Sequence, residues 1–244
     1  MDSGFYAAAA GLKAQSQALE VVAHNLANVN TPGFRGEQPT FQSLLALARP
    51  SAFNALNLAT NNFGVLEGTH LDLNSGNLTS TGNPLDAAIE GSGFFVVDTP
   101  RGARYTRNGS FRVSSAGELV TAAGDPVEGT TGVIRVPVGH VAISPDGTLS
   151  VNGAIAGQIR VVDFATGTAL AAEGGTLLSA PPNSAQAASK ASLRQATLES
   201  SNVDAIGSVT ALIAVQREAE MMGRAMTLID TELNHTAASE LAKV

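Results

Sequence analysis

At 244 residues, the chain is long enough for one large domain or two small ones. It contains no cysteine, which excludes a disulfide framework and a thiolate zinc site, and its net charge of -7 argues against non-specific binding to nucleic acid or to an anionic membrane. Charged residues account for 14% of the chain, against about a quarter in an average protein, so much of the surface is neutral and suited to packing against other protein.

The chain begins without the basic segment and the unbroken apolar run of a cleaved secretory signal. No stretch approaches the roughly 20 apolar residues that a membrane-spanning helix needs. We therefore expect a protein that is not embedded in a membrane and that, if it leaves the cytoplasm, uses an export route without signal cleavage.

An apolar stripe with a spacing of three and four residues runs along the start of the chain. Its members are Phe5, Ala8, Leu12, Leu19, Val22 and Leu26. Gln15 interrupts the stripe. Such a stripe is typical of a coiled coil or a bundle helix, so we predict a helix from about Ser3 to Asn28. Asn28 is expected to end the helix in a left-handed conformation, and Thr31-Pro32-Gly33 to turn the chain away.

The segment after this helix has weaker patterns. Apolar side chains at four positions predict a short amphipathic turn or helix before Pro50: Phe41, Leu44, Leu45 and Ala48. Residues 50–70 are rich in Asn, Thr, Ala and Gly without a clear period, and we interpret them as an extended or poorly ordered connector.

From about Leu71 the apolar period changes to two, which is typical of strands. Gly93–Asp98 is predicted to be a strand. Asn108-Gly109 favours a type I′ turn with positive φ at both residues, so Arg104–Arg107 and Ser110–Val113 are predicted to form a hairpin.

Turn residues divide the following stretch into short segments, with turns predicted at Ala116-Gly117, Gly124-Asp125-Pro126 and Pro145-Asp146-Gly147. Strands are predicted between and after them, at Glu118–Thr121, Val133–Val138, Val141–Ile143, Thr148–Val151 and Gln158–Phe164. The spacing describes a compact antiparallel β domain that ends near Pro181-Pro182.

Residues 183–192 are predicted to be a return linker, and a helical pattern resumes from about Leu193 and continues close to the end of the chain. Its apolar stripe is unbroken: Leu212, Val215, Ala219, Met222, Met226, Ile229 and Leu233. The predicted fold is α+β, with terminal helices that form a coiled-coil layer around a central, mostly antiparallel β domain. The predicted parts are a helical domain (1–30 with 200–244), a connector region (31–71 with 183–199) and a β-rich domain (72–182).

Residues able to support catalysis or metal binding are scattered. The four histidines fall in four different segments, and no two of them have metal-ligand spacing on one helix: His24, His70, His140 and His235. Acidic residues lie mostly at turns, where carboxylates cap backbone donors. We therefore expect no enzymatic activity, no cofactor, no metal and no small-molecule substrate.

The terminal stripes favour assembly. A pair of isolated helices is marginally stable in water, and each large apolar side chain contributes about 1.5–3 kcal/mol only when a partner covers it. The sequence therefore predicts ends that are frayed in the monomer and ordered in an assembly.

Several motifs, taken in order, resemble the rod and hook proteins that build the axial structure of the bacterial flagellum. The motifs that carry this resemblance are Asn25-Leu26-Ala27-Asn28, Thr31-Pro32-Gly33-Phe34-Arg35, Thr81–Asp86, Gly93–Val97, Tyr105–Phe111, Gly117–Thr121, Leu198–Val203 and Gln216-Arg217. Length and the short β insert are similar to the rod members of the family. The pattern Gly157–Phe164 is most similar to proximal-rod members, because distal-rod members usually carry Asn-Pro where this chain continues with Ala165-Thr166-Gly167.

The resemblance implies a structural subunit whose terminal helices pair as an inner coiled-coil layer that lines an axial channel and transmits torque, with the β domain outside it. The implied partners are copies of the chain, other rod proteins and the flagellar type III export apparatus, in the periplasmic rod of the basal body. The implied assembly residues are Leu12, Leu19, Val22, Asn25, Leu26, Asn28, Leu212, Val215, Met222, Met226, Ile229 and Leu233. Asn28 to Phe34 would set the angle at which the chain leaves the first helix.

Two alternatives belong to other functional classes. A secreted β-domain adhesin would use its terminal helices as an oligomeric stalk, with the seam at one end, whereas here the first and last helices flank a single insert. A cell-wall hydrolase would need a cleft that holds an acid together with a nucleophile or base.

Overall fold

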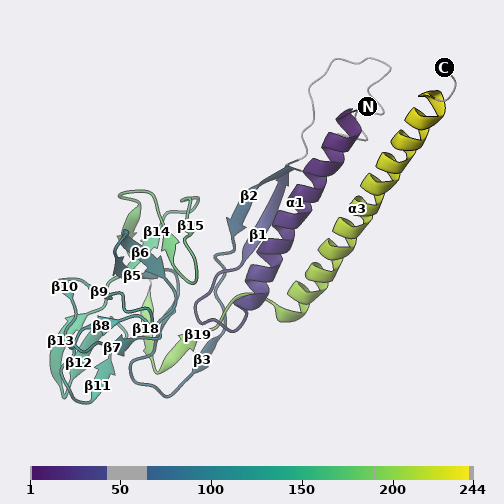
Figure 1. Cartoon of the computed structure of the whole chain (residues 1–244). Helices are drawn as coiled ribbons and strands as arrows, with labels where there is room; N and C mark the ends of the chain where they lie inside the picture. Colours follow the sequence, from purple (N-terminus) through teal and green to yellow (C-terminus); the bar gives the residue numbers. More distant parts are fainter. Residues whose placement is uncertain (1, 43–64, 189–190, 242–244) are drawn as a thin grey trace. The chain divides into compact units, whose positions relative to one another are not determined.

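A computed structural model describes residues 2–42, 65–188 and 191–241 of the chain (Figure 1). These residues form an α+β fold in which helices α1 (Asp2–Ala27) and α3 (Ala205–Leu241) precede and follow a long series of short strands. The chain divides into two compact units. The helical unit contains Met1–Ala27, Glu37–His70 and Asp204–Val244, and the β unit contains Asn28–Gly36 and Leu71–Val203.

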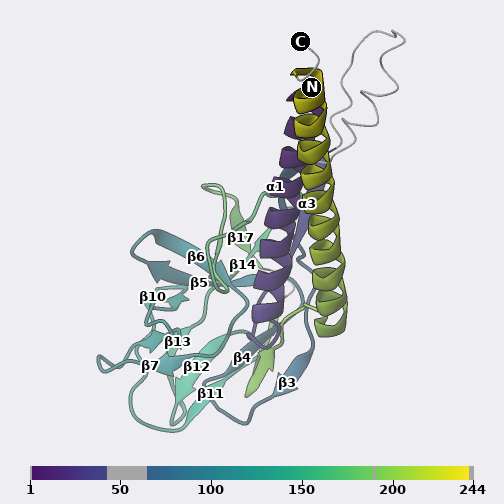
Figure 2. The ribbon, with the colours of Figure 1, turned by 45° about the vertical axis from the view of Figure 1, so that its right-hand side comes forward.

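In the helical unit, α1 and α3 run antiparallel and side by side, so that the start of α1 and the end of α3 lie at the same end of the helix pair (Figures 1 and 2). The alanine-rich sequence of α1 has high helix propensity. Asp204 caps the start of α3, because its carboxylate accepts hydrogen bonds from the backbone N–H groups of Ile206 and Gly207 (3.2 and 3.0 Å). Neither helix, over the residues that the structure describes, is long and apolar enough to cross a membrane.

Strands β1 (Glu37–Gln42) and β2 (Val65–Leu71) pair with each other, and β1 lies against α1. The side-chain amide of Asn25 near the end of α1 fixes this contact, since it donates to the carbonyl of Glu37 (2.6 Å) and accepts from its N–H (2.9 Å). The amphipathic helix predicted around Phe41 is therefore wrong at that residue, which is part of β1. The rest of that segment and most of the expected connector lie outside the described residues.

The first helix ends where the sequence predicts, but by a different cap. Asn28 does not adopt positive φ; among the described non-glycine residues, only Asn152, Asn183 and Ala196 do so. The chain instead forms a turn in which the N–H of Thr31 donates to the carbonyl of Asn28 (3.1 Å).

The largest sheet of the β unit has the strand order β15-β16-β6-β5-β14-β17, with antiparallel pairing throughout. Its strands are β5 (Phe94–Thr99), β6 (Gly102–Thr106), β14 (Val161–Phe164), β15 (Ala171–Ala172), β16 (Leu178–Ser179) and β17 (Ala185–Ala187). A second sheet joins β11 (Val141–Ile143), β12 (Thr148–Val151) and β13 (Ala154–Gln158).

Four two-stranded ribbons complete the β unit (Figure 1). They pair β3 (Leu78–Ser80) with β19 (Thr197–Glu199), β4 (Ala87–Glu90) with β18 (Ser192–Gln195), β7 (Arg112–Val113) with β8 (Leu119–Val120), and β9 (Glu128–Gly129) with β10 (Gly132–Val133).

The core of the β unit is apolar and joins side chains from most of these strands. Its largest fully buried members include Phe95, Leu119, Val127, Ile134 and Leu149. Phe95 meets Phe111 edge to face, with ring centroids 5.0 Å apart. Side chains of this size contribute about 1.5–3 kcal/mol each when buried, and all members of this core come from the β unit itself.

The predicted hairpin at Asn108-Gly109 is wrong. Strand β6 pairs with β5 and β16, and β7 pairs with β8. Gly109 does not have positive φ. Glycine is needed there because a Cβ would lie 1.6 Å from the carbonyl oxygen of Ala87. The close approach of two chain segments, not a turn, thus explains this residue.

Other local predictions hold in part. The strands predicted at 93–98, 141–143 and 148–151 are confirmed, and the predicted turn glycines Gly117, Gly124 and Gly147 all have positive φ. Val133–Val138 is a strand only at its start, and the segment predicted at 158–164 contains the end of β13, a break and β14. The helical pattern expected from Leu193 is wrong up to residue 204, because strands β18 and β19 occupy this stretch and α3 begins at Ala205.

Candidate assembly interface and junction cluster

The predicted assembly residues of α1 lie half-buried along the helix, except for Val22, which is 8% exposed. The half-buried members are Leu12, Leu19, Asn25 and Leu26, with Asn28 just beyond the helix end. The most buried positions of α1 include small residues that the stripe did not contain, Gly11, Ala14 and Ala18. Small residues allow close approach of the backbone elements that cover α1.

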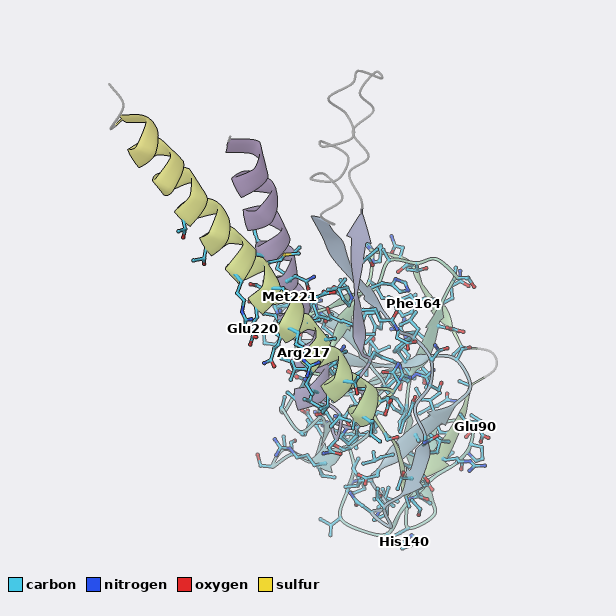
Figure 3. The ribbon with its side chains drawn as sticks, turned by 90° about the vertical axis from the view of Figure 1, so that its right-hand side faces the viewer. Glu90, His140, Phe164, Arg217, Glu220 and Met221 are labelled. Atoms are coloured by element: carbon cyan, nitrogen blue, oxygen red, sulfur yellow. The ribbon has the colours of Figure 1, made fainter. Side chains whose placement is uncertain are left out.

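The predicted assembly residues of α3 follow one helical face. Leu212, Val215, Met222 and Met226 are half-buried, and the side chains of Ile229 and Leu233 lie outside the described part of the chain. Ala211 and Ala219 share this half-buried face, which has the three- and four-residue period of a packed helix. Figure 3 labels Arg217, Glu220 and Met221 on the same helix, all of them exposed.

A second set of apolar side chains on α3 is exposed to solvent. Ile206 is 80% exposed and Met221 is 62% exposed, and Val209 and Ile213 are also exposed. Ile206, Val209 and Ile213 are three and four residues apart and so lie on one side of the helix. Exposed apolar side chains grouped along one helix are typical of a surface that contacts other protein.

Gln15, which interrupts the N-terminal stripe, forms a direct contact between the two helices. Gln15 Nε2 donates a hydrogen bond of 2.7 Å to Glu218 Oε2. On α3 itself, Glu220 and Arg224 form an i,i+4 ion pair at 4.0 Å, with both side chains exposed.

Sequence reasoning missed a buried charge cluster in the β unit, which we call the junction cluster: Arg35, Arg107, Glu199 and Asn202. Glu199 is 1% exposed and binds two guanidinium groups, Arg35 Nη2 at 2.6 Å and Arg107 Nη1 at 3.2 Å. Both arginines are 4% exposed. Arg35, Arg107 and Glu199 each lie in a different one of the motifs that carry the family resemblance. The motifs alone do not distinguish a buried carboxylate from an exposed one.

Backbone contacts complete the junction cluster. Glu199 Oε1 also accepts the N–H of Gly76 (2.8 Å), and the carbonyl of Glu199 accepts the N–H of Gly33 (2.7 Å). Gly33 has φ +69°, and a Cβ there would lie 2.2 Å from the backbone nitrogen of Asn108. A side chain at position 33 would therefore separate the N-terminal motif from the segment after β6 that carries Arg107 and Asn108.

Asn202 provides a second set of contacts in the junction cluster. Its Oδ1 accepts the N–H of Gly36 (2.8 Å), and its Nδ2 donates to the carbonyls of Asp72 (2.8 Å) and Asn74 (3.0 Å). Its own N–H donates to the carbonyl of Phe34 (3.4 Å). One amide side chain thus joins three separate segments of the chain.

Burial dominates the electrostatics of the junction cluster. Desolvation lowers the pKa of Arg107, the carboxylate of Glu199 opposes this effect, and the nearby charge of Arg35 adds to it. Arg107 also donates to the carbonyls of Ile89 (3.2 Å) and Gly91 (2.8 Å), and its guanidinium lies 5.2 Å from the ring centroid of Phe94. These contacts hold two cations beside one anion, an arrangement suited to fixing structure.

The other polar groups of the β unit serve local structure. Asp146, at a predicted turn, accepts the backbone N–H (3.0 Å) and the hydroxyl of Thr148, and the backbone bond is the main cause of its lowered pKa. A pocket of about 260 Å³ is lined by small polar, alanine and glycine residues and by Leu177, with Asp125 as its one acidic side chain. Over the described residues, no three His, Asp or Glu side chains are grouped as metal ligands would be.

Comparison with known proteins identifies the family. Residues 5–35 match the model of the flagella basal body rod protein family, and residues 88–151 match that of the flagellar hook protein FlgE/F/G D1 domain. The chain is 33% identical to the flagellar basal-body rod protein FlgF of Caulobacter vibrioides over the full length of both proteins. It is 34% identical to the basal-body rod protein FlgG of Bacillus subtilis (92% of this chain, 94% of the relative) and 33% identical to FlgF of Escherichia coli (94% and 95%).

These matches confirm the resemblance that the motifs carry and favour a rod subunit over the adhesin and hydrolase alternatives. The matched N-terminal region contains most of α1 together with Gly33, Phe34 and Arg35 of the β unit. The family is structural and not enzymatic, and its members assemble with other rod components in the basal body. The chain therefore belongs to the flagellar basal-body rod proteins of the bacterial flagellum.

Proposed function

We propose that this rod subunit assembles through coiled-coil packing of its terminal helices, which line the axial export channel and transmit torque between subunits. The helical domain (1–30 with 200–244) is the assembly part, and the β-rich domain (72–182) is the outer part. The proposed interface residues are Leu12, Leu19, Val22, Asn25, Leu26, Asn28, Leu212, Val215, Met222, Met226, Ile229 and Leu233.

The observation that carries this proposal is the distribution of apolar residues on α3. One face is half-buried, while Ile206, Val209 and Ile213 on another side of the helix remain exposed. A helix pair in isolation has no cover for this second set, and copies of the chain or other rod proteins provide one. Met222 and Met226 are adaptable side chains, which suits contacts with neighbours that are not identical.

We further propose a proximal position in the rod and export by the flagellar type III apparatus without signal cleavage. The pattern Gly157–Phe164 and the FlgF relatives support the position. The low fraction of charged residues is compatible with subunits that pack closely on all sides. Asn28 to Phe34 would set the direction in which the chain leaves α1, with Gly33 and Phe34 held inside the β unit.

The experiment that tests the assembly role replaces one seam residue on each helix by a charge. Leu26→Asp and Met226→Asp should abolish rod assembly and motility, because each would bury a carboxylate in an apolar contact. Ser16→Asp on the exposed side of α1 is the matched control and should have a smaller effect. Full motility of cells that carry either seam variant would contradict the proposed interface.

Hydrogen exchange on the dilute, monomeric protein provides the second test. If assembly completes the terminal helices, then residues 72–180 are protected while 2–27 and 205–241 exchange rapidly. Equal protection in all three regions would show that the helix pair is self-sufficient, and the frayed-end hypothesis would then be rejected.

A further inference from the structure

Three segments of the β unit adjoin parts of the chain that belong to the helical unit. Residues 28–36 lie between α1 and β1, the segment from Leu71 to Asn77 begins at the last residue of β2, and residues 197–203 precede α3. We call them the joining segments. They are distant in sequence, yet all three belong to the same compact unit.

Two residues of the last joining segment, Glu199 and Asn202, bind the first and second joining segments. Glu199 binds Arg35 of the first segment and the N–H of Gly76 of the second. Asn202 binds the N–H of Gly36 in the first and the carbonyl of Asp72 in the second. The first and second segments also meet directly, since the N–H of Asp72 donates to the carbonyl of Gly36 (2.8 Å).

Without the last joining segment, the positive charges of Arg35 and Arg107 have no paired counter-charge within the described part of the chain. Arg35 and Arg107 are both 4% exposed, and Glu199 is the one carboxylate with which either forms an ion pair among the described residues. Three of their nitrogens have no protein acceptor even with Glu199 in place: Arg35 Nε, Arg35 Nη1 and Arg107 Nε. Burying two guanidinium groups without Glu199 is strongly unfavourable, because each loses its hydration without a counter-charge.

We propose that Glu199 is a latch that closes the β unit. The first joining segment, with Arg35 and Phe34, docks stably only when the C-terminal segment that carries Glu199 docks too. The three joining segments therefore open and close as one cooperative unit, separately from the sheet formed by β5, β6 and β14. Arg35 of the N-terminal motif thus finds its counter-charge in Glu199, 164 positions later in the chain.

The first test measures hydrogen exchange in the full-length chain carrying Glu199→Gln. This variant keeps the shape and one acceptor oxygen but removes the charge. Exchange at the amides of Gly33, Gly36 and Asp72 should accelerate about a hundredfold or more, while amides of β5 and β6 keep most of their protection. The control is Glu90→Gln, which breaks the exposed pair with Arg194 and should leave all these amides unchanged.

A rescue variant separates loss of the counter-charge from general damage. Arg35→Met in the Glu199→Gln background removes one uncompensated cation while it keeps the bulk of the side chain. The double variant should regain protection of the joining segments relative to Glu199→Gln alone. Protection in the double variant that is equal to or lower than in Glu199→Gln would overturn the latch.

Pulse-labelling during refolding of the unmodified chain tests the order of closure, and it remains informative if Glu199→Gln does not fold. Amides of residues 28–36 and 197–202 should become protected in the same kinetic phase, after those of β5 and β6. Protection of residues 28–36 in an earlier phase than residues 197–202 would show that the first segment docks without the latch, and the proposal would be wrong.

Discussion

Gln15 Nε2 and Glu218 Oε2 are 2.7 Å apart and link α1 to α3 at the one position where the N-terminal apolar stripe is interrupted. A polar residue within an apolar helix seam commonly favours one register over others. The interruption, which weakened the periodic pattern in the sequence, therefore corresponds to a specific contact between the two helices.

Charge changes at Gln15 test this contact. Gln15→Glu places a second carboxylate beside Glu218 and should weaken the helix pair by about 0.5 kcal/mol, while Gln15→Lys should strengthen it by a similar amount. The midpoint of the thermal loss of helical circular dichroism would report both changes. High salt should reduce the difference between the two variants, because it screens exposed charges. Identical midpoints at low salt would show that the two side chains do not meet in solution.

Gly109 offers a test of the close approach between chain segments in the β unit. Gly109→Ala would place a Cβ 1.6 Å from the carbonyl oxygen of Ala87, so the segments would have to separate. We expect a loss of several kcal/mol in the free energy of unfolding, of the size seen when strain disrupts a core. Urea titration followed by a probe in the β unit measures it.

The same substitution in α3 is the control for Gly109. Gly223 has no atom within 4 Å of a built Cβ, and its helix favours alanine over glycine by about 1 kcal/mol. Gly223→Ala should therefore be neutral or stabilising. If both glycines tolerated alanine equally, the approach of Gly109 to Ala87 would have to be looser than the structure has it.

Arg107→Lys tests the geometry of the guanidinium. Arg107 contacts Glu199 and the carbonyls of Ile89 and Gly91 through two different nitrogens, and one ammonium cannot reproduce this fork. We expect a loss of about 2–4 kcal/mol in stability of the β unit. Arg194→Lys, in the exposed pair with Glu90, should change stability by less than about 0.5 kcal/mol. Equal stability of the two variants, measured by urea titration, would contradict a structural role for Arg107.

Acid should loosen the pairing of β15 with β16 at the edge of the largest sheet. The hydrogen bond from Arg104 is the main cause of the lowered pKa of Glu173, and Arg101 also pairs with this carboxylate. A lowered folded-state pKa contributes stability above the ordinary pKa of a glutamate, about 4.3, and this contribution is lost as the pH falls through the folded-state value. Local exchange near β15 should rise in that range, and Glu173→Gln should abolish this pH dependence. An unchanged acid response in the variant would assign the effect to other carboxylates.

Local patterns predict the elements whose stability is local. The stripe from Leu12 to Leu26 identifies α1, a continuous apolar run identifies β5, and alternating buried residues identify β11 and β12. Pairing over long distances is not visible in the same way. Strand β18 contains buried Leu193 and exposed Arg194, but its partner β4 lies about a hundred residues earlier, and the alanine-rich flanks resemble a helix.

The junction cluster, too, could not be predicted from local sequence patterns. Glu199 lies 164 residues from Arg35 and 92 from Arg107, so no spacing rule connects them. Charged residues are rarely buried unless paired, and the pair becomes visible only when the fold brings the motifs together. The proposed assembly residues on α1 and α3, by contrast, follow mainly from helical periodicity, and their role in assembly stays a prediction.

The composition of the β unit from two separate stretches has a practical consequence for fragment design. A recombinant piece that begins at Leu71 and ends at Val203 would contain Arg107 and Glu199 but would leave the site of Phe34, which is 2% exposed, without its occupant. Residues 28–36 would have to be added as a free peptide or fused after Val203 as a circular permutation. Affinity of the peptide for the piece would then report, in a binding assay, how strongly the N-terminal motif is held.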